Sequence, residues 1–453
     1  MDKIAILPLF VSAYLLLQKN SKEVFILFFL PLLTVVPTYY EVKIISGLPE
    51  VNFYIAGMLP ILLVWLFKEK AISYRFSLLD SFIFLNLLTL FISQYYTSSY
   101  KVAQKFIFNE SMARLFPYLL MKTYFAEREE RQKVIRIIII LGAIVGLLNL
   151  WEFRIWDNFF DKYIRKIWPY YVPWDLPMKR GGFKRAFGPF GHPIIAGYFF
   201  ALVLPIGIWY WRKKLFTKKW HGPLVIALLF AGGIASISRA PIAAMFIGLI
   251  ILWFGWTRRK VFVLSLILLG AIVFSSVYLP KIIGYVSINR SMAETADQRN
   301  AAYRMELLEN YIQIVNQKPV LGWGRFSVPW VDNQVSIDNE YLFLALTHGK
   351  LNLFMYLSTI IVCLFRLTIF IWKEKQNSQE KEIAWCFVAA ILSGTITQTT
   401  VWNGFQIVPY FYMFLAMSEA IVIYRPNPNR EVSQSLAIEL MPQSHAYHFS
   451  RTL

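Results

Sequence analysis

The chain has 453 residues, of which 57% are apolar and only 16% carry a charge. A soluble protein has about a quarter of its residues charged, so this composition excludes an ordinary soluble domain. The formal net charge is +19, but most Lys and Arg residues lie in short segments between apolar runs. Membrane topology requires that placement, so it does not indicate a nucleic-acid-binding surface, and we expect no nucleic-acid partner.

Apolar runs without a charge or a polar face recur along the whole chain, for example at 135–150 and 261–279. Such runs predict transmembrane helices, which satisfy their own backbone hydrogen bonds as the lipid interior demands. The predicted fold class is all-α, a polytopic integral membrane protein with about 12–13 transmembrane helices. The expected spans are 4–17, 24–38, 52–67, 77–95, 103–121, 134–151, 192–211, 223–237, 241–256, 261–279, 342–372, 383–401 and 405–424.

Two of these spans need comment. Residues 342–372 are too long for one upright helix at about 1.5 Å per residue, so we expect a surface helix that turns at Gly349. The first run is interpreted as a span and not as a signal peptide, because Gln18-Lys19-Asn20 follows it in place of a small-residue cleavage site.

The basic residues between the spans set the expected orientation. The positive-inside rule places all of these clusters in the cytoplasm, and their alternation along the chain agrees with that placement. They lie at 122–133, 212–219, 258–260, 373–381 and Arg425. The N-terminus and two longer loops, about 152–191 and about 280–341, are then outside. Residues 1–425 form one transmembrane domain, and the polar segment 426–453 is expected to be a disordered cytoplasmic tail.

The outer loop at 152–191 departs from the positive-inside rule. It is basic and rich in Trp and Tyr: it holds Arg154, Lys162, Arg165, Lys166, Lys179, Arg180, Lys184 and Arg185 together with Trp156, Trp168, Tyr170, Tyr171 and Trp174. One interpretation is an interfacial segment that touches anionic headgroups, and the other is a platform for an anionic, lipid-borne substrate. Both predict contact with the membrane.

Three arginines lie where this topology places the outer rim of the membrane. Arg185 precedes the span that opens at His192, and Arg239 occupies the turn between two spans. Arg304 lies in a part of the large outer loop that is typical of a surface helix. Arginine is a permanently charged planar fork that matches phosphate oxygens, so three on one face would neutralise a pyrophosphate without a metal ion. Each one alone is equally well explained as an arginine at the membrane interface.

Two carboxylates stand at the mouth of a later span, in Asp338-Asn339-Glu340-Tyr341-Leu342. Asp338 or Glu340 is the candidate general base for an incoming hydroxyl, and helix capping is the alternative role. Trp323, Trp330 and Tyr341 are candidates for stacking on sugar rings, with ordinary interfacial aromatics as the alternative.

The order of the motifs indicates more than any one of them. The string Arg185-Ala186-Phe187-Gly188-Pro189-Phe190-Gly191-His192-Pro193 precedes a span, and Ser238-Arg239 separates two spans. Arg304 then stands ahead of the Pro-x-x-Gly-x-Gly of 319–324, whose glycines permit a close backbone turn, and the Asp-Asn-Glu-Tyr-Leu of 338–342. This series resembles the O-antigen polymerase and ligase superfamily of bacterial envelope polysaccharide synthesis over roughly residues 180–365.

The resemblance implies a C-type glycosyltransferase of the bacterial inner membrane that needs no metal or other cofactor. Members of the family pass a glycan from undecaprenyl pyrophosphate to an acceptor sugar on the outer face of the membrane. Arginines matching Arg185, Arg239 and Arg304 would bind the pyrophosphate, and a residue of the Asp-Asn-Glu-Tyr-Leu stretch would deprotonate the acceptor. The implied partners are the lipid-linked glycan donor, the acceptor glycan, membrane lipid, and flippase and chain-length regulator proteins.

Ligases of this family usually have His-Asn where the present chain has Asp338-Asn339. We therefore predict a polymerase of lipid-linked repeat units for O-antigen or exopolysaccharide, with a ligase as the alternative. The base stays open between Asp338 and Glu340, with His192 and His348 as spare candidates.

Two further classes stay open. A transporter or lipid flippase needs ionisable groups near the bilayer midplane, and the spans hold few besides Asp80 and Glu110. A structural scaffold of a polysaccharide assembly complex is the other. The sequence contains no GxxxxGK[ST] motif, and Cys363 and Cys386 both lie in predicted spans without spaced partners.

Overall fold

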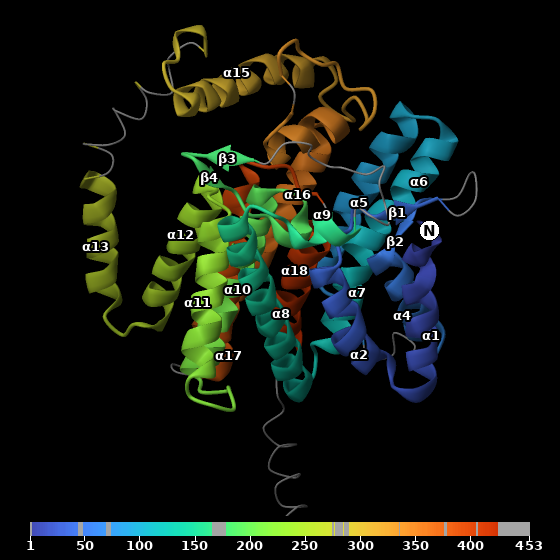
Figure 1. Ribbon diagram of the computed structural model, residues 1–453, viewed down its shortest axis with the longest axis vertical. Coiled ribbons are helices and arrows are strands. Elements are labelled where there is room, and N and C mark those ends of the chain that lie inside the picture. The colour runs from blue at the N-terminus through green and yellow to red at the C-terminus, as the bar shows by residue number, and fades with distance from the viewer. Residues whose placement is uncertain are drawn as a thin grey trace, which may run out of the picture.

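The structure is a computed structural model, and it describes residues 2–43, 49–68, 74–164, 178–273, 276, 284, 290–334, 336–375, 378–404 and 406–424. The basic and aromatic part of the outer loop at 165–177 and the tail from 425 onward lie outside the described residues, so the predictions made for them stay predictions. The described residues form helices and two short β-hairpins (Figure 1).

The helices follow one another in the order of the predicted spans. They are η1 (Asp2–Ile6), α1 (Leu7–Gln18), α2 (Ser21–Val24), η2 (Phe25–Phe29), α3 (Leu30–Val35), α4 (Phe53–Phe67), α5 (Leu78–Thr97), α6 (Tyr100–Glu110), η4 (Ser111–Leu115), α7 (Phe116–Tyr124), α8 (Arg128–Ile155), α9 (Phe159–Ile164), η5 (Gly188–Phe190), α10 (Pro193–Arg212), α11 (His221–Ala235), α12 (Arg239–Trp256), α13 (Lys260–Val273), η7 (Arg290–Met292), α15 (Ala296–Gln317), α16 (Glu340–Lys373), α17 (Gln379–Gln398) and α18 (Ile407–Ile423). The hairpins pair β1 (Glu41–Val42) with β2 (Val51–Asn52), and β3 (Lys179–Arg180) with β4 (Phe183–Lys184).

Five of the described helices, α5, α8, α10, α12 and α16, are long and apolar enough to cross a membrane. Shorter apolar helices accompany them at Ile4–Gln18, Phe53–Phe67, His221–Ala235, Lys260–Gly270 and Ile407–Ile423. The prediction of an all-α polytopic membrane protein is confirmed. At its spans 24–38 and 103–121 the helices run over 21–35 and 100–124, and each contains a π-helical turn, η2 and η4 respectively.

Helix α10 lies at the centre of the bundle. Its sequence is apolar on every face, so it is buried on all sides, as expected for a helix without a polar stripe. It packs against α8, α11, α12, α17 and α18. Close helix contacts rely on small residues: a Cβ added to Gly232 of α11 would overlap the backbone of Gly146 in α8.

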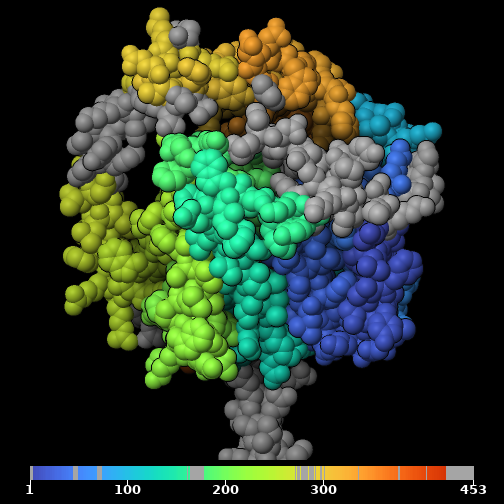
Figure 2. Space-filling view, viewed as in Figure 1, coloured from blue at the N-terminus to red at the C-terminus, as the bar shows by residue number. Residues whose placement is uncertain are grey.

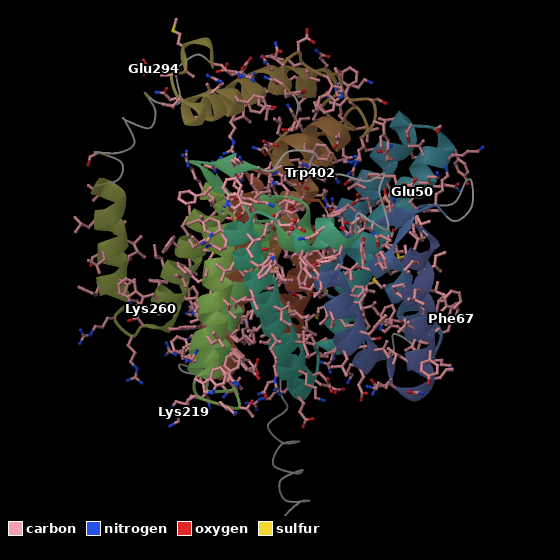
Figure 3. All side chains as sticks on the ribbon, viewed as in Figure 1. Glu50, Phe67, Lys219, Lys260, Glu294 and Trp402 are labelled. Atoms are coloured by element: carbon pink, nitrogen blue, oxygen red, sulfur yellow. The ribbon has the colours of Figure 1, made fainter. Side chains whose placement is uncertain are left out.

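The two ends of the bundle differ in character. Lys219 and Lys260, from two of the basic clusters, lie toward the lower end in Figure 3, and Glu294 lies at the opposite end. Helix α15 extends across that opposite end as a cap over the long helices (Figures 1 and 2). Two of the basic clusters and the large loop with its surface helix thus lie at opposite ends of the bundle. The assignment of these ends to the cytoplasmic and outer sides stays a prediction of the positive-inside rule.

The long helix α16 turns at Gly349, which has φ 81° and ψ 170°, so the turn expected there is present. The Pro-x-x-Gly-x-Gly segment packs into this kink. Trp323 and Gly324 donate their backbone N–H groups to the carbonyls of Leu346 and Thr347, at 2.9 and 2.7 Å. Gly322, at φ 70°, lies so close to the kink that a Cβ would overlap the carbonyl of Thr347. The glycine pattern therefore fixes the outer part of α16, at whose start the candidate carboxylates lie.

Candidate active site

The turn between α11 and α12 is strained. Ile237 has φ 42°, a value that β-branched residues rarely adopt. Ser238 is the N-cap residue of α12, but its hydroxyl makes no capping bond and donates instead to the carbonyl of Ser236, 3.1 Å away. The first turn of α12 therefore has no side-chain cap, and helix N-termini in this state are favourable places for an anion.

Two arginines are bound to this turn through neutral oxygens. Arg185 donates from Nη2 to the hydroxyl of Ser238 at 2.9 Å and from Nε to the carbonyl of Ser236 at 3.4 Å. Arg180 donates from Nη1 to the carbonyl of Ile237 at 3.1 Å. Because these acceptors carry no formal charge, the bonds orient both guanidinium groups without neutralising them.

The β3–β4 hairpin brings Arg180 to this position. Its strands are joined by Gly181 and Gly182, both with positive φ, which is the conformation that a two-residue hairpin turn requires. Arg180 pairs with Phe183 across the hairpin, and Arg185 follows directly after the second strand. One short hairpin thus delivers both arginines to the α11–α12 turn.

We define the outer cap as the part of the predicted outer loop from Arg290 to Asn339, which contains α15. Arg304 and Asp338 belong to it. Tyr303 fixes the approach to α16, because its hydroxyl donates to the carbonyl of Ser336 at 2.6 Å and accepts the N–H of the same residue at 3.1 Å. The hydroxyl of Ser336 in turn donates to Oδ1 of Asp338 at 2.8 Å. These hydrogen bonds fix the position of the Asp338 carboxylate relative to Tyr303 and therefore relative to the adjacent residue, Arg304.

These pieces enclose one cavity of about 240 Å³. Arg180, Arg185, Arg239, Arg304 and Asp338 all line it. Burial, together with the positive charges of Arg180 and Arg304, lowers the pKa of Arg185 to about 10, and the Asp338 carboxylate opposes this effect. Burial also lowers the pKa of Arg304. A cavity with this excess of positive charge is suited to a multiply charged anion such as a pyrophosphate.

The structure brings four of the five predicted site residues together and separates the fifth. Arg185, Arg239, Arg304 and Asp338 share the cavity, whereas Glu340 does not line it. Glu340 is 1% exposed, and its Oε2 accepts the backbone N–H of Asn403 at 2.6 Å. A carboxylate in this setting supports the segment after α17.

The spare histidines and the candidate stacking aromatics are placed differently. His192 lines the cavity as the N-cap of α10, where Nδ1 accepts the N–H of Ile194 at 3.2 Å. His348 is buried against Ser93 and Phe106, away from the cavity. The aromatics Trp323, Trp330 and Tyr341 do not line it either.

Sequence reasoning counted Arg180 only as one of many basic residues in the outer loop. The signal that singles it out is the Lys179-Arg180-Gly181-Gly182 string, because a two-glycine turn pairs Arg180 with Phe183, and Arg185, two residues further on, then lies on the same face of the hairpin.

Residues 224–357 match the O-antigen ligase family model, Wzy_C. The resemblance predicted from the order of the motifs is confirmed. This family supports a glycosyl-transferring enzyme of surface polysaccharide synthesis, in a multi-pass membrane protein. The chain matches no protein in a search of curated proteins.

The matched segment of this O-antigen ligase-like chain contains Arg239, Arg304, Asp338 and Glu340. Arg185 and Arg180 precede it. The charged cavity is therefore built from the family segment and from a hairpin that lies outside it.

Proposed function

We propose that the chain polymerises undecaprenyl-pyrophosphate-linked repeat units of a surface polysaccharide, on the outer face of the bacterial inner membrane. The observation that carries the proposal is the cavity shared by Arg180, Arg185, Arg239, Arg304 and Asp338. Its cations suit the diphosphate of a lipid-linked donor, and its carboxylate suits the activation of an acceptor hydroxyl.

The proposed reaction is a single displacement with inversion at the anomeric carbon. Asp338 takes the proton of the acceptor hydroxyl, whose oxygen forms the new bond to the anomeric carbon. The bond from that carbon to the pyrophosphate oxygen breaks, and the electron pair leaves with the pyrophosphate. The arginines and the N-terminus of α12 stabilise this growing negative charge, an effect worth about 3 kcal/mol for one well-placed group.

Asp338 is favoured over Glu340 as the base because it lies in the charged cavity. Glu340 already accepts a backbone N–H from Asn403 in a buried position. The geometry of the two carboxylates therefore supports a division of work, with Asp338 at the reacting atoms and Glu340 holding the neighbouring segment.

A ligase is the second candidate, and the description of the matched family favours it. The two differ only in the acceptor: a polymerase extends a lipid-linked glycan, and a ligase transfers the glycan to another acceptor. Asp338-Asn339 in place of the His-Asn usual in ligases supports the polymerase.

The test is a transfer assay with purified protein, the organism's own undecaprenyl-pyrophosphate-linked repeat unit and EDTA. The wild type should give a ladder of longer lipid-linked glycans, and Arg239→Ala should lower the rate by about 10²–10³-fold. Absence of any ladder with folded wild-type protein contradicts the polymerase. Transfer to lipid A core, added to the same assay as an acceptor, would establish the ligase in its place.

A further inference from the structure

A second cavity, of about 590 Å³, lies apart from the arginine cavity. Most of its wall comes from the first 114 residues: the β1–β2 hairpin, the start of α4, α6 and the π-helical turn η4. Arg325 and Phe326 and the segment 402–404 close it. Glu50 and Trp402, two of its lining residues, both lie in the half of the molecule that carries Glu294 (Figure 3). Its size is in the range of small-ligand sites in proteins.

The lining combines aromatic surfaces with hydrogen-bonding groups. Phe326, Trp402 and Tyr39 supply aromatic faces, and Phe326 is 70% exposed although it is large and apolar. Glu41 and Glu50 from the β1–β2 hairpin supply carboxylate oxygens in the same wall. Aromatic faces for C–H surfaces and planar acceptors for hydroxyl groups are the two elements that a sugar ring requires.

A buried polar group in the wall lacks a partner. Asn403 is 6% exposed, and its Nδ2 donates to the hydroxyl of Tyr356 at 3.2 Å, but its Oδ1 accepts no hydrogen bond. Buried amide oxygens are nearly always satisfied, and this one has almost no accessible surface, so a donor in the cavity would reach it after a small rotation of the side chain. A sugar hydroxyl is such a donor.

The cavity also contains an organised ionic group. Glu110, the last residue of α6, forms an ion pair with Arg114 of the π-helical turn. Its Oε1 also lies 3.2 Å from Nη1 of Arg325, which comes from the segment after α15. π-Helical turns are frequent at functional sites, because the extra residue redirects a side chain. Here the turn contains Arg114, which lines the cavity. Over the whole lining, the formal charges of Lys105, Arg114 and Arg325 balance those of Glu41, Glu50 and Glu110, whereas cations are in excess in the first cavity.

One short segment connects the two cavities. Thr400 lines the arginine cavity, and Trp402, two residues later, lines the second. Asp338 and Glu340 are related in the same way, since Asp338 lines the first cavity and Glu340 bonds to Asn403 of the second. Ligands in the two cavities would therefore approach each other across this segment.

We propose that the second cavity binds the terminal sugars of the acceptor glycan and presents a hydroxyl to the donor in the arginine cavity. The identification of this ligand as the acceptor rests on the proposed function. The aromatic faces and the balanced formal charge of this wall favour an uncharged or amino sugar over a phosphate. The charge of each substrate would therefore decide which of the two cavities it enters.

The experiment measures binding of a soluble oligosaccharide, released from the organism's lipid-linked repeat unit and free of lipid and phosphate, to the full-length protein in nanodiscs. Phe326→Ala and Glu41→Gln should each weaken binding on the order of tenfold, the loss of about 1.4 kcal/mol. The matched controls are Phe354→Ala, on the exposed face of α16, and Glu294→Gln on the outer cap. Both controls and Arg239→Ala should bind as the wild type does.

Unchanged binding in both cavity variants, or an equal loss in Arg239→Ala, would overturn the proposal. In the transfer assay, with the soluble oligosaccharide added as a separate acceptor, the cavity variants should raise the KM for that acceptor and leave the KM for the lipid-linked donor unchanged. A wild type that binds the oligosaccharide through Phe326 and Glu41 but transfers nothing would contradict the proposed polymerase and leave the sugar-binding cavity supported.

Discussion

Arg185 reaches from the β3–β4 hairpin to the hydroxyl of Ser238, 2.9 Å from its Nη2, at the start of α12. That bond joins a hairpin outside the family segment to the strained turn inside it. The Ser238 hydroxyl consequently accepts a hydrogen bond from Arg185 and does not cap the N-terminus of α12, which stays uncapped on the cavity side. The first turn of α12 and the guanidinium group of Arg185 thus both line the cavity in which the proposed pyrophosphate would bind.

Arg304→Ala tests the contribution of the outer cap to the charged cavity. We expect transfer to fall by about 10²–10³-fold, because one preorganised cation is lost from the leaving-group site. The matched control is Arg299→Ala, an exposed arginine of the same helix that does not line the cavity, and it should leave the rate unchanged. Equal rates for the two variants would remove Arg304 from the proposed pyrophosphate site.

Asp338→Asn separates the two candidate bases. The amide keeps the shape of the side chain and can still accept the hydroxyl of Ser336, but it cannot take a proton, so kcat should fall by about 10²–10⁴-fold. Glu340→Gln keeps an oxygen for the N–H of Asn403 and should stay within about tenfold of the wild type. The reverse order of the two rates would assign the base to Glu340.

Ile237→Gly tests the strain in the α11–α12 turn. Relief of an unfavourable φ is worth about 1–3 kcal/mol, and the greater freedom of glycine in the unfolded chain offsets about 0.5–1 kcal/mol of it. We therefore expect the variant to unfold at a higher temperature in detergent. Ile247→Gly, in the interior of α12, is the control and should destabilise by about 1 kcal/mol. A lower Tm for Ile237→Gly would show that the contacts of the Ile237 side chain stabilise the fold by more than its unfavourable φ destabilises it.

Glu41 gives a pH dependence that can be measured. Burial, together with the neighbouring Glu50 carboxylate, raises the pKa of Glu41 from its ordinary value of 4.5 to about 7. The stability that this group contributes is therefore complete below pH 4.5 and is lost as the pH rises through 7. Between pH 5 and 8 the Tm of the wild type should fall relative to that of Glu41→Gln, and Glu294→Gln should show no such difference. Parallel curves for wild type and Glu41→Gln would contradict the raised pKa.

Much of the fold could be predicted because the bilayer imposes it. Uncharged apolar runs leave a helix as the sole low-energy state in lipid, so the predicted spans fall on helices. The turn at Gly349 was also predictable, since 342–372 exceeds the bilayer thickness and glycine alone adopts φ 81° without strain. The packing of 319–324 into that turn was not, because sequence spacing does not say which backbone groups a loop will satisfy.

The candidate site divides in a similar way. Arg185, Arg239 and Arg304 were found because arginine is unusual at the end of an apolar run and a pyrophosphate explains three of them together. Arg180 was passed over among the other basic residues of its loop. The second cavity was missed because its wall joins residues as distant as Glu41 and Trp402, whose approach depends on helix packing. Trp323, Trp330 and Tyr341 looked like better sugar platforms in the sequence, yet neither cavity contains them.

The origin of Arg180 and Arg185 has a consequence for protein engineering. A chimaera that exchanged residues 224–357 between two such enzymes would carry Arg239, Arg304 and Asp338 into a host that supplies its own hairpin. The graft would work only where the host hairpin fits the transplanted α11–α12 turn, bond for bond, at Ser236, Ile237 and Ser238. The smallest exchangeable unit of this site therefore begins at Lys179, well ahead of the boundary that sequence similarity marks.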